Sequence, residues 1–243
     1  AATTYGSMGA VQNLSGNFLV PQTLGQLRGN NLFHSFSRFS ILNGESATFT
    51  TSAAGLKHVI ARVTGGEVST IDGRLRLVSA NAAPDFWLLN PSGVMVGANA
   101  SFDVPAGLHL STAQQLRFAD GSTWSTGSAT DASTLSVAAP ESFGFLSGQA
   151  AAPLKWQGAN LFLNALSPLD LAGGSISLEG GLLVTPGGAI TLRSPGAVTV
   201  APGTAVIAGY AGSTAGSIAV DAASLTIDGG GLGGTAGLGV LLG

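Results

Sequence analysis

Five short stretches in the carboxy-terminal third of the chain alternate a large aliphatic residue with a small or hydroxyl-bearing one. They are SISL (175–178), AITL (189–192), AVTV (197–200), SIAV (217–220) and SLTI (224–227). A period of two is typical of a β-strand with one buried face. Because Gly, Pro or other small residues precede each stretch, we expect separate short strands joined by tight turns.

The predicted strands recur about every 20 residues. The spacings are 22 and 20 residues in the series Ile176, Val198, Ile218, and 23 and 19 residues in the series Leu183, Val206, Leu225. Repeats of this length are typical of solenoids, in which each coil buries its aliphatic face against its neighbours. The spacing therefore predicts an all-β chain folded as a parallel β-helix, with roughly ten coils of ~20 residues and a length of ~50 Å.

A turn interrupts the apolar run at 86–97, which reads FWLLNPSGVMVG. Asn, Pro and Gly at the first, second and fourth positions of Asn90-Pro91-Ser92-Gly93 are the residues that a β-turn favours. We expect a corner between strands at 86–89 and 94–96, followed by strands within 98–104 and 106–111. Leu88 and Leu108, 20 residues apart, occupy similar settings.

Composition agrees with a stack of short strands. The chain holds 37 Gly and 10 Pro, only 9% of its residues are charged, and no window has the apolar spacing of a long helix. A net charge of −3, without a basic cluster, argues against nucleic acid as a partner. At 243 residues the chain is expected to form a single domain.

The chain has no cysteine, which suits a protein that crosses the periplasm unfolded, because a disulfide-closed loop could not thread a narrow pore. The small residues of AATTYG suit a mature terminus left by removal of a signal peptide. The Gly-rich end at 228–243 has no polar cap, so we expect this chain to be the front of a longer protein.

Four blocks in uninterrupted order resemble the successive motifs of the two-partner-secretion domain, the amino-terminal secretion module of filamentous-haemagglutinin-type exoproteins. The resemblance covers about residues 10–147, and the remaining third resembles the family only as generic β-helix. The blocks are NNLFHSFSRFSILNGESATFT (30–50), VIARVTGGEVSTIDGRLRL (59–77), FWLLNPSGVMVGANASFDVPAGLHLSTAQQLRFADG (86–121) and STLSVAAPESFGFL (133–146).

The resemblance implies a right-handed parallel β-helix with an amino-terminal cap, here residues 1–30, and a small extra-helical sheet. Motif-bearing coils would occupy 31–147 and generic coils 148–243. The implied partner is an outer-membrane barrel transporter whose periplasmic POTRA domains engage the module and start its export. The implied location is the surface or surroundings of a Gram-negative cell. Adhesion, haemolysis, haem capture and contact-dependent killing are activities of the downstream parts of such exoproteins.

The family's Asn-Pro-Asn-Gly-Ile motif falls on Asn90, Pro91, Ser92, Gly93 and Val94, with Ser and Val replacing the second Asn and the Ile. Both replacements keep a turn followed by an aliphatic strand residue. A separate Asn-Pro-Asn-Leu motif of one branch is missing, and LFHSFSRF (32–39) places the chain in the branch that lacks it.

The Asn90 corner has two interpretations, a transporter-recognition epitope or a turn that sets the register of the coils. We favour the second because each residue type has a geometric reason to be there. On that interpretation Asn90→Asp is expected to be milder than Asn90→Ala, since Asp can make the same forward bond to the backbone.

Residues Asn31, Phe33, His34 and Phe36 form the second candidate site. We expect the aromatic side chains to lie on one side of a strand, and favour core packing under the cap over recognition.

Histidine chemistry is not supported by the sequence. Neighbours on a strand point to opposite faces, so adjacent His34 and Ser35 do not make a hydrolytic pair. His58 and His109 are each expected to be isolated, without partners at metal-ligand spacing. We therefore expect no metal site, no cofactor and no small-molecule substrate, and a monomeric protein that is not an enzyme.

Two other classes of β-helix protein remain as alternatives. A polysaccharide-active enzyme needs carboxylates that converge on one groove, for which Asp72, Asp85 and Asp103 are the candidates. An ice-binding solenoid needs a flat array of threonines. Thr191, Thr199 and Thr226 occupy central strand positions, but Ser177 and Ala219 break the series.

Overall fold

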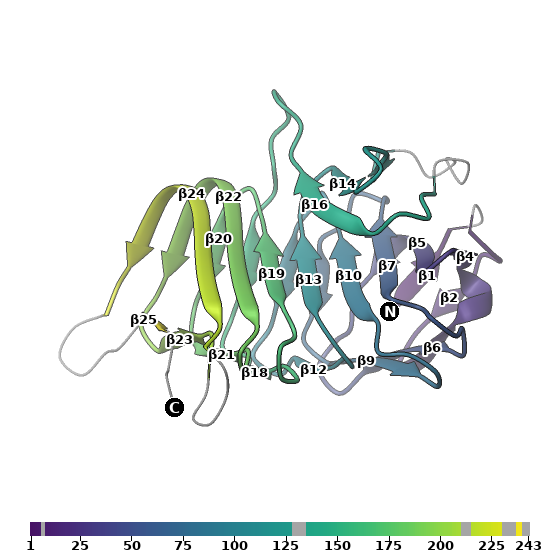
Figure 1. Cartoon of the computed structure of the whole chain (residues 1–243), viewed down its shortest axis with the longest axis horizontal. Helices are drawn as coiled ribbons and strands as arrows, with labels where there is room; N and C mark the ends of the chain where they lie inside the picture. The colour runs from purple at the N-terminus through teal and green to yellow at the C-terminus, as the bar shows by residue number, and fades with distance from the viewer. Residues whose placement is uncertain (6–7, 128–134, 210–214, 230–236, 240–243) are drawn as a thin grey trace.

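The computed structural model describes residues 1–5, 8–127, 135–209, 215–229 and 237–239 (Figure 1). Residues 133 and 134, which begin the fourth motif block, and much of the Gly-rich end lie outside these ranges. Within them the chain is almost entirely strands and turns, with one 3-10 turn, η1 (Gln22–Leu24). The described residues include no helix long and apolar enough to cross a membrane.

The strands build the predicted parallel β-helix, whose coils each contribute to three faces (Figure 1). The first face stacks β5 (Asn31–Phe39), β7 (His58–Val63), β10 (Asp85–Leu89), β13 (Leu108–Ser111) and β19 (Leu169–Ala172). The second face stacks β8 (Ser69–Ile71), β11 (Val94–Val96), β17 (Leu154–Trp156) and β20 (Ile176–Leu178). Both faces continue into β22 (Ala189–Val200) and β24 (Ser217–Ile227).

The third face has two sections. One stacks β3 (Asn17–Pro21), β6 (Ser46–Thr51), β9 (Arg74–Ser79) and β12 (Ser101–Asp103). The other stacks β18 (Leu161–Phe162), β21 (Gly181–Val184), β23 (Thr204–Ile207) and β25 (Gly237–Gly239). In β9 Leu75 and Leu77 point inward and Arg74, Arg76 and Val78 outward, which is the alternation expected of a half-buried strand.

The coils are longer and fewer than the sequence predicted. Registered residues of the first face are 27 positions apart at Asn31 and His58, 22 at Phe86 and Leu108, and 28 at Ile190 and Ile218. In the described part of the chain seven strands make up this face, β5, β7, β10, β13, β19, β22 and β24, instead of roughly ten. At ~4.8 Å per strand the stack is ~30 Å long.

The predicted registers are right in two cases and wrong in two. Ile176 pairs with Val198 and Leu183 with Val206, as expected, whereas Val198 pairs with Leu225 and Val206 with Leu238. Leu88 and Leu108 do occupy similar settings, since both are buried in the main core on adjacent strands, although Leu88 pairs with Leu110. AITL and AVTV belong to one strand, β22, in which a bulge between Ser194 and Ala197 carries the chain from the first face to the second.

The predicted cap region, residues 1–30, contains antiparallel strands together with the first strand of the third face. β1 (Ala2–Thr4) and β4 (Gln26–Arg28) pair antiparallel with β5, and β2 (Asn13–Leu14) pairs with β1. β3 is already part of the helix, because it stacks in parallel under β6. The antiparallel strands therefore occupy the amino-terminal edge of the first face.

A small antiparallel sheet lies outside the helix, as the resemblance implied. It consists of β14 (Gln115–Phe118), β15 (Thr123–Ser125) and β16 (Pro140–Gly144), which come from the excursion between β13 and β17. Figure 1 shows β14 and β16 above the first face of the helix.

The extra-helical sheet gives the molecule a second core. The main core fills the helix with aliphatic residues and phenylalanines, including the inward-pointing Ile190 and Val198 that the sequence predicted. The second core lies between the first face and the extra-helical sheet; it contains Met8, Phe33, Ile60, Trp87, Leu89, Ala113, Leu116, Phe118, Trp124, Leu135, Phe143 and Ala172.

Candidate functional site

The Asn90 corner forms the predicted turn. The Ser92 N–H donates to Asn90 Oδ1 at 2.9 Å, and the Gly93 N–H donates to the Asn90 carbonyl at 3.0 Å. Gly93 has a φ of 125°, which L side chains rarely adopt, and a Cβ here would meet Val68 at 3.3 Å. The side chain of Asn90 and the freedom of Gly93 therefore both fix the shape of the corner.

The same corner also ties successive coils together, which sequence reasoning missed. Asn90 Nδ2 donates to the Glu67 carbonyl at 2.8 Å and to Ser69 Oγ at 2.9 Å in the preceding coil. The Asn90 N–H donates to the Ser111 carbonyl at 2.9 Å in the following coil. Asn90 is completely buried, so its side chain acts as a clamp inside the stack.

Ser92, Gly93 and Val94 border a shallow hollow of about 380 Å³, although only Ser92 of the three is partly exposed. Val68, which precedes β8, and Met95 and Lys155 of β11 and β17 also line it. The accessible part of the motif is therefore Pro91 and Ser92 and not the amide of Asn90.

The aromatic residues of β5 do not lie on one side of the strand, contrary to the prediction. Phe33 belongs to the second core and Phe36 to the main core. The two residues are three positions apart, and residues an odd number of positions apart on a strand point to opposite faces. Both faces of β5 are buried, so both aromatic side chains are core residues.

The outer side of β5 anchors the extra-helical sheet. Asn31 Nδ2 donates to the carbonyls of Ser136 at 3.0 Å and Ala138 at 2.6 Å, in the segment that leads into β16. The Phe33 ring packs edge-on against Trp124 at 4.9 Å between ring centroids. Two of the predicted site residues thus connect the first coil with a sheet about a hundred residues further along the chain.

Arg62 completes this anchor and was not predicted. Its Nε donates to Ser35 Oγ at 3.0 Å, one of its terminal nitrogens donates to the Ser125 carbonyl at 2.5 Å, and its guanidinium lies 4.5 Å from the centre of the Trp124 ring. The side chain is fully buried. A charged residue within the apolar stretch VIARV was the available signal, since charges are buried only with specific partners.

The inner side of β5 packs into the main core. The His34 ring stacks with Phe36, with 6.2 Å between ring centroids, and meets the Phe49 ring edge-on, with 5.4 Å between centroids. Burial lowers the pKa of His34 to about 4, so the imidazole is neutral at pH 7.

The two candidate sites lie apart on the first face. The second candidate site is on β5 in the first coil, and the Asn90 corner follows β10, two coils further along.

His58 and His109 are not isolated, contrary to the prediction. Asp85 Oδ2 lies 3.6 Å from His58 Nδ1 and 3.6 Å from His109 Nε2, and Asp170 bonds His109 Nδ1. The sequence hid this cluster because its members are brought together only by the stacking of β7, β10, β13 and β19. No group that could hold a metal ion was found among the described residues.

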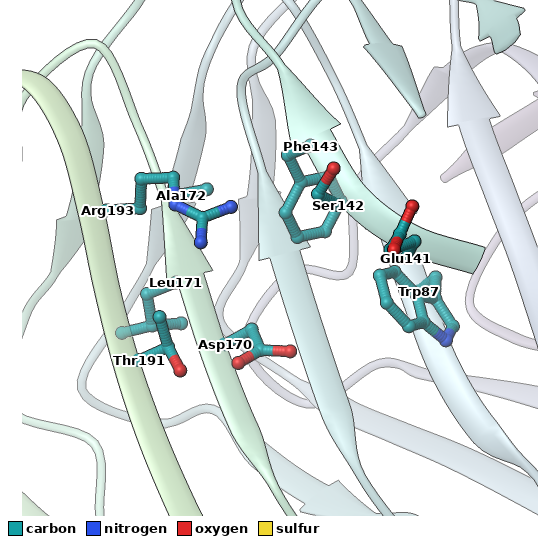
Figure 2. A pocket seen from close by; sticks show the side chains of 9 residues that line it. All are labelled: Trp87, Glu141, Ser142, Phe143, Asp170, Leu171, Ala172, Thr191 and Arg193. Atoms are coloured by element: carbon teal, nitrogen blue, oxygen red, sulfur yellow. The ribbon is translucent and has the colours of Figure 1, made fainter. Parts of the chain in front are cut away.

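A cavity of about 150 Å³ lies between the extra-helical sheet and the first face (Figure 2). Glu141 and Phe143 of β16, Trp87 of β10, and Asp170 and Arg193 of the later coils line it.

The candidate catalytic carboxylates do not gather in one groove. Asp72 accepts hydrogen bonds from Asn99, and Asp103 of β12 pairs with Arg74 and Arg76 on the third face. Asp85 lies on the first face with its two histidines. Each carboxylate thus has structural partners of its own.

The threonines do not form one array either. Thr199 pairs with Ser177 and Thr226, whereas Thr191 pairs with Asp170 and Ala219. They therefore fall on two faces of the helix. Further along the row of Thr199 lies Lys155, which breaks the pattern.

Comparison with known proteins agrees with this architecture. The chain matches the model of the family described as TPS secretion domain over residues 1–232. The match extends beyond residues 10–147, where the motifs are concentrated, into the carboxy-terminal coils. No curated protein matches the chain.

Proposed function

The chain belongs to the family of TPS secretion domains, and we propose that it is the segment recognised by the periplasmic POTRA domains of an outer-membrane transporter. Membership makes it the secretion domain of a two-partner-secretion exoprotein, which is exported with the help of a cognate transporter. The family match over residues 1–232 is the observation that carries the proposal.

The proposed route has three steps. A signal peptide directs the chain to the periplasm, the POTRA domains capture the chain in extended form, and the β-helix folds after it has crossed the outer membrane. The absence of cysteine supports this route, because no disulfide loop can form in the oxidising periplasm. The low charge supports it too, because few ions must be desolvated in transit.

Folding at the cell surface then proceeds coil by coil. Each coil buries its aliphatic face only against its neighbours, so every added coil is stabilised as it forms. This folding hinders return of the chain and biases its transit outward. The exoprotein is proposed to be of the adhesin or haemagglutinin type, and the domain to act as a monomer without enzymatic activity.

Within this function, the Asn90 corner is proposed to act as a fold determinant. Its support is the buried amide that bonds to the turn and to the preceding coil. Lys155, which lines the hollow beside the motif, offers a matched control, because Lys155→Glu changes this surface without removing those bonds. A fold determinant predicts that Asn90→Ala lowers stability and secretion together, whereas an epitope predicts that Lys155→Glu impairs secretion at normal stability.

The central test is secretion of this chain, with a signal peptide, in cells with and without the cognate transporter. We expect the protein in the medium only when the transporter is present, and in the periplasm otherwise. Binding of the unfolded chain to isolated POTRA domains is then measured directly. Equal amounts in the medium of both strains would remove the proposal.

A second experiment tests transit in the unfolded state. Thr199 and Thr226 are registered neighbours on adjacent strands, at a spacing that suits a disulfide. The double variant Thr199→Cys/Thr226→Cys is expected to be retained in the periplasm and released by reductant. Thr199→Cys alone is the control and is expected to be secreted normally. Unimpeded export of the oxidised double variant would contradict transit as an unlooped chain.

A further inference from the structure

The β-helix has one join that differs from all its other coil contacts on the first face. Leu108 of β13 pairs with Leu169 of β19, 61 positions later, because the excursion that forms the extra-helical sheet intervenes. Other registered pairs on this face are 21 to 28 positions apart, as at Leu169 and Ile190. Closing a longer loop costs more chain entropy, so this join depends more on its own contacts.

His109 stands across this join. Its Nδ1 bonds Asp170 of β19, and its Nε2 lies 3.6 Å from Asp85 Oδ2 of β10. The ring is stacked flat on Trp87, with 3.6 Å between ring centroids and 5° between planes, and only 4% of the side chain is exposed. One imidazole therefore connects the coils before the excursion with the coils after it.

The charges around His109 favour its protonated form. β10 and β19 place one carboxylate at each ring nitrogen, and β7 adds His58 on the far side of Asp85. Glu141 of β16 and Arg193 of β22 line the neighbouring cavity with Asp170 (Figure 2). Arg193 lies 3.8 Å from Asp221 of the next coil, so its charge is partly offset.

We propose that His109 is a proton-dependent latch, which holds the carboxy-terminal coils on the amino-terminal ones while the imidazole is charged and loosens the join when it is neutral. Protonated, the ring donates from Nδ1 to Asp170 across the join, and it places its positive charge 3.6 Å from Asp85 on the near side. Neutral, the ring no longer attracts either carboxylate by its charge, so the bond across the join to Asp170 loses its ionic character in a mostly buried setting.

The titration behaviour agrees with this geometry. Burial alone lowers the pKa of His109, but the hydrogen bonds and negative charges of Asp170 and Asp85 outweigh it and raise the pKa above 6.5. The latch is therefore fully closed below about pH 6.5 and opens as the pH rises through the raised pKa. The pKa of Asp85 is lowered well below its usual value despite burial, chiefly by His109 and His58, so this carboxylate stays charged throughout that range.

Hydrogen exchange resolved by strand tests the latch on the whole chain. Between about pH 6 and about pH 9, protection of β19 and β22 is expected to fall about tenfold for each unit by which the pKa is raised, after correction for intrinsic exchange. Protection of β5 and β7 is expected to stay constant. An equal loss in both groups of strands would overturn the proposal.

Three variants sharpen the test. His109→Gln and Asp170→Asn are expected to abolish the pH dependence, because neither leaves a titrating pair across the join. His58→Gln is the matched control and is expected to keep it, since His58 contacts Asp85 without crossing the join. Persistence of the pH dependence in His109→Gln would overturn the latch. Should the variants fail to fold, NMR titration of wild-type His109 decides, and a pKa below 6.5 would overturn the latch as well.

Discussion

At the scale of single residues, Asn90 shows how far the type of a residue predicts its role. The turn follows from Asn, Pro and Gly at set positions, and the expected bond to the Ser92 N–H is present. The two bonds from the amide nitrogen to Glu67 and Ser69 could not be predicted, because they depend on which residues of another coil lie opposite. They change what a substitution is expected to do.

Asn90→Asp is now expected to be at least as harmful as Asn90→Ala. Alanine removes three hydrogen bonds in a buried site, which costs about 2–4 kcal/mol. Aspartate keeps the turn bond but loses both amide donations, and it buries a charge against the Glu67 carbonyl. Denaturant midpoints of both variants measure this. An aspartate variant close to wild-type stability would show that the bonds to the preceding coil matter little.

Ile190 provides a second test at this scale. It is fully buried in the main core and registered between Leu169 and Ile218. Ile190→Ala is expected to lower the free energy of unfolding by about 2–5 kcal/mol through lost burial and a residual cavity. Thr191→Ala, one position along on the outer side, is the control and is expected to cost less than about 1 kcal/mol. Equal effects of the two substitutions would mean that the strand faces are assigned the wrong way round.

At the scale of elements, strands of the first face differ from those of the third. β5, β7 and β10 are buried on both faces, whereas β9 alternates between buried and exposed residues. Their sequences reflect this, since FWLL (86–89) is continuously apolar and RLRL (74–77) alternates. The continuous apolar runs therefore indicate that a second layer covers the first face, although they do not indicate which residues form that layer.

Spacing predicts that coils exist but does not predict their register. Strands of all three faces share the same alternation, so AVTV and SIAV look like successive repeats although they belong to different faces. The length of each corner decides which strands stack, and corners vary freely at the surface. The excursion before β17 and the long last coil are such variations, which is why the number of coils was overestimated.

The extra-helical sheet is expected to depend on Trp124. This side chain is fully buried between Phe33 and the guanidinium of Arg62. Trp124→Ala removes both contacts and is expected to cost about 3–5 kcal/mol in the docking of the sheet. Limited proteolysis should then cut near β14 and β15 while the helix stays intact. Phe162→Ala, at a position 59% exposed, serves as control and should leave the cleavage pattern unchanged.

At the scale of the whole molecule, two histidines with opposite surroundings set the response to pH. His34 lies fully buried in the first coil, where the loss of water disfavours its charge, and His109 lies at the join between two carboxylates, which favour its charge. Since each coil is stabilised by its neighbours, a change at either position spreads along the stack. Stability is therefore expected to be greatest near neutral pH and to fall on both sides.

The acid side of this profile is the last prediction. The pKa of His34 is lowered from 6.5 to about 4 by burial, so the folded state resists protonation that the unfolded chain accepts. The stability that neutral His34 contributes is fully present above about pH 6.5 and is lost as the pH falls towards 4, by about 3 kcal/mol in all. Denaturant midpoints between about pH 4 and 7 measure the loss, and His34→Leu should flatten the curve whatever its absolute stability. An undiminished slope in His34→Leu would assign the acid sensitivity to another group.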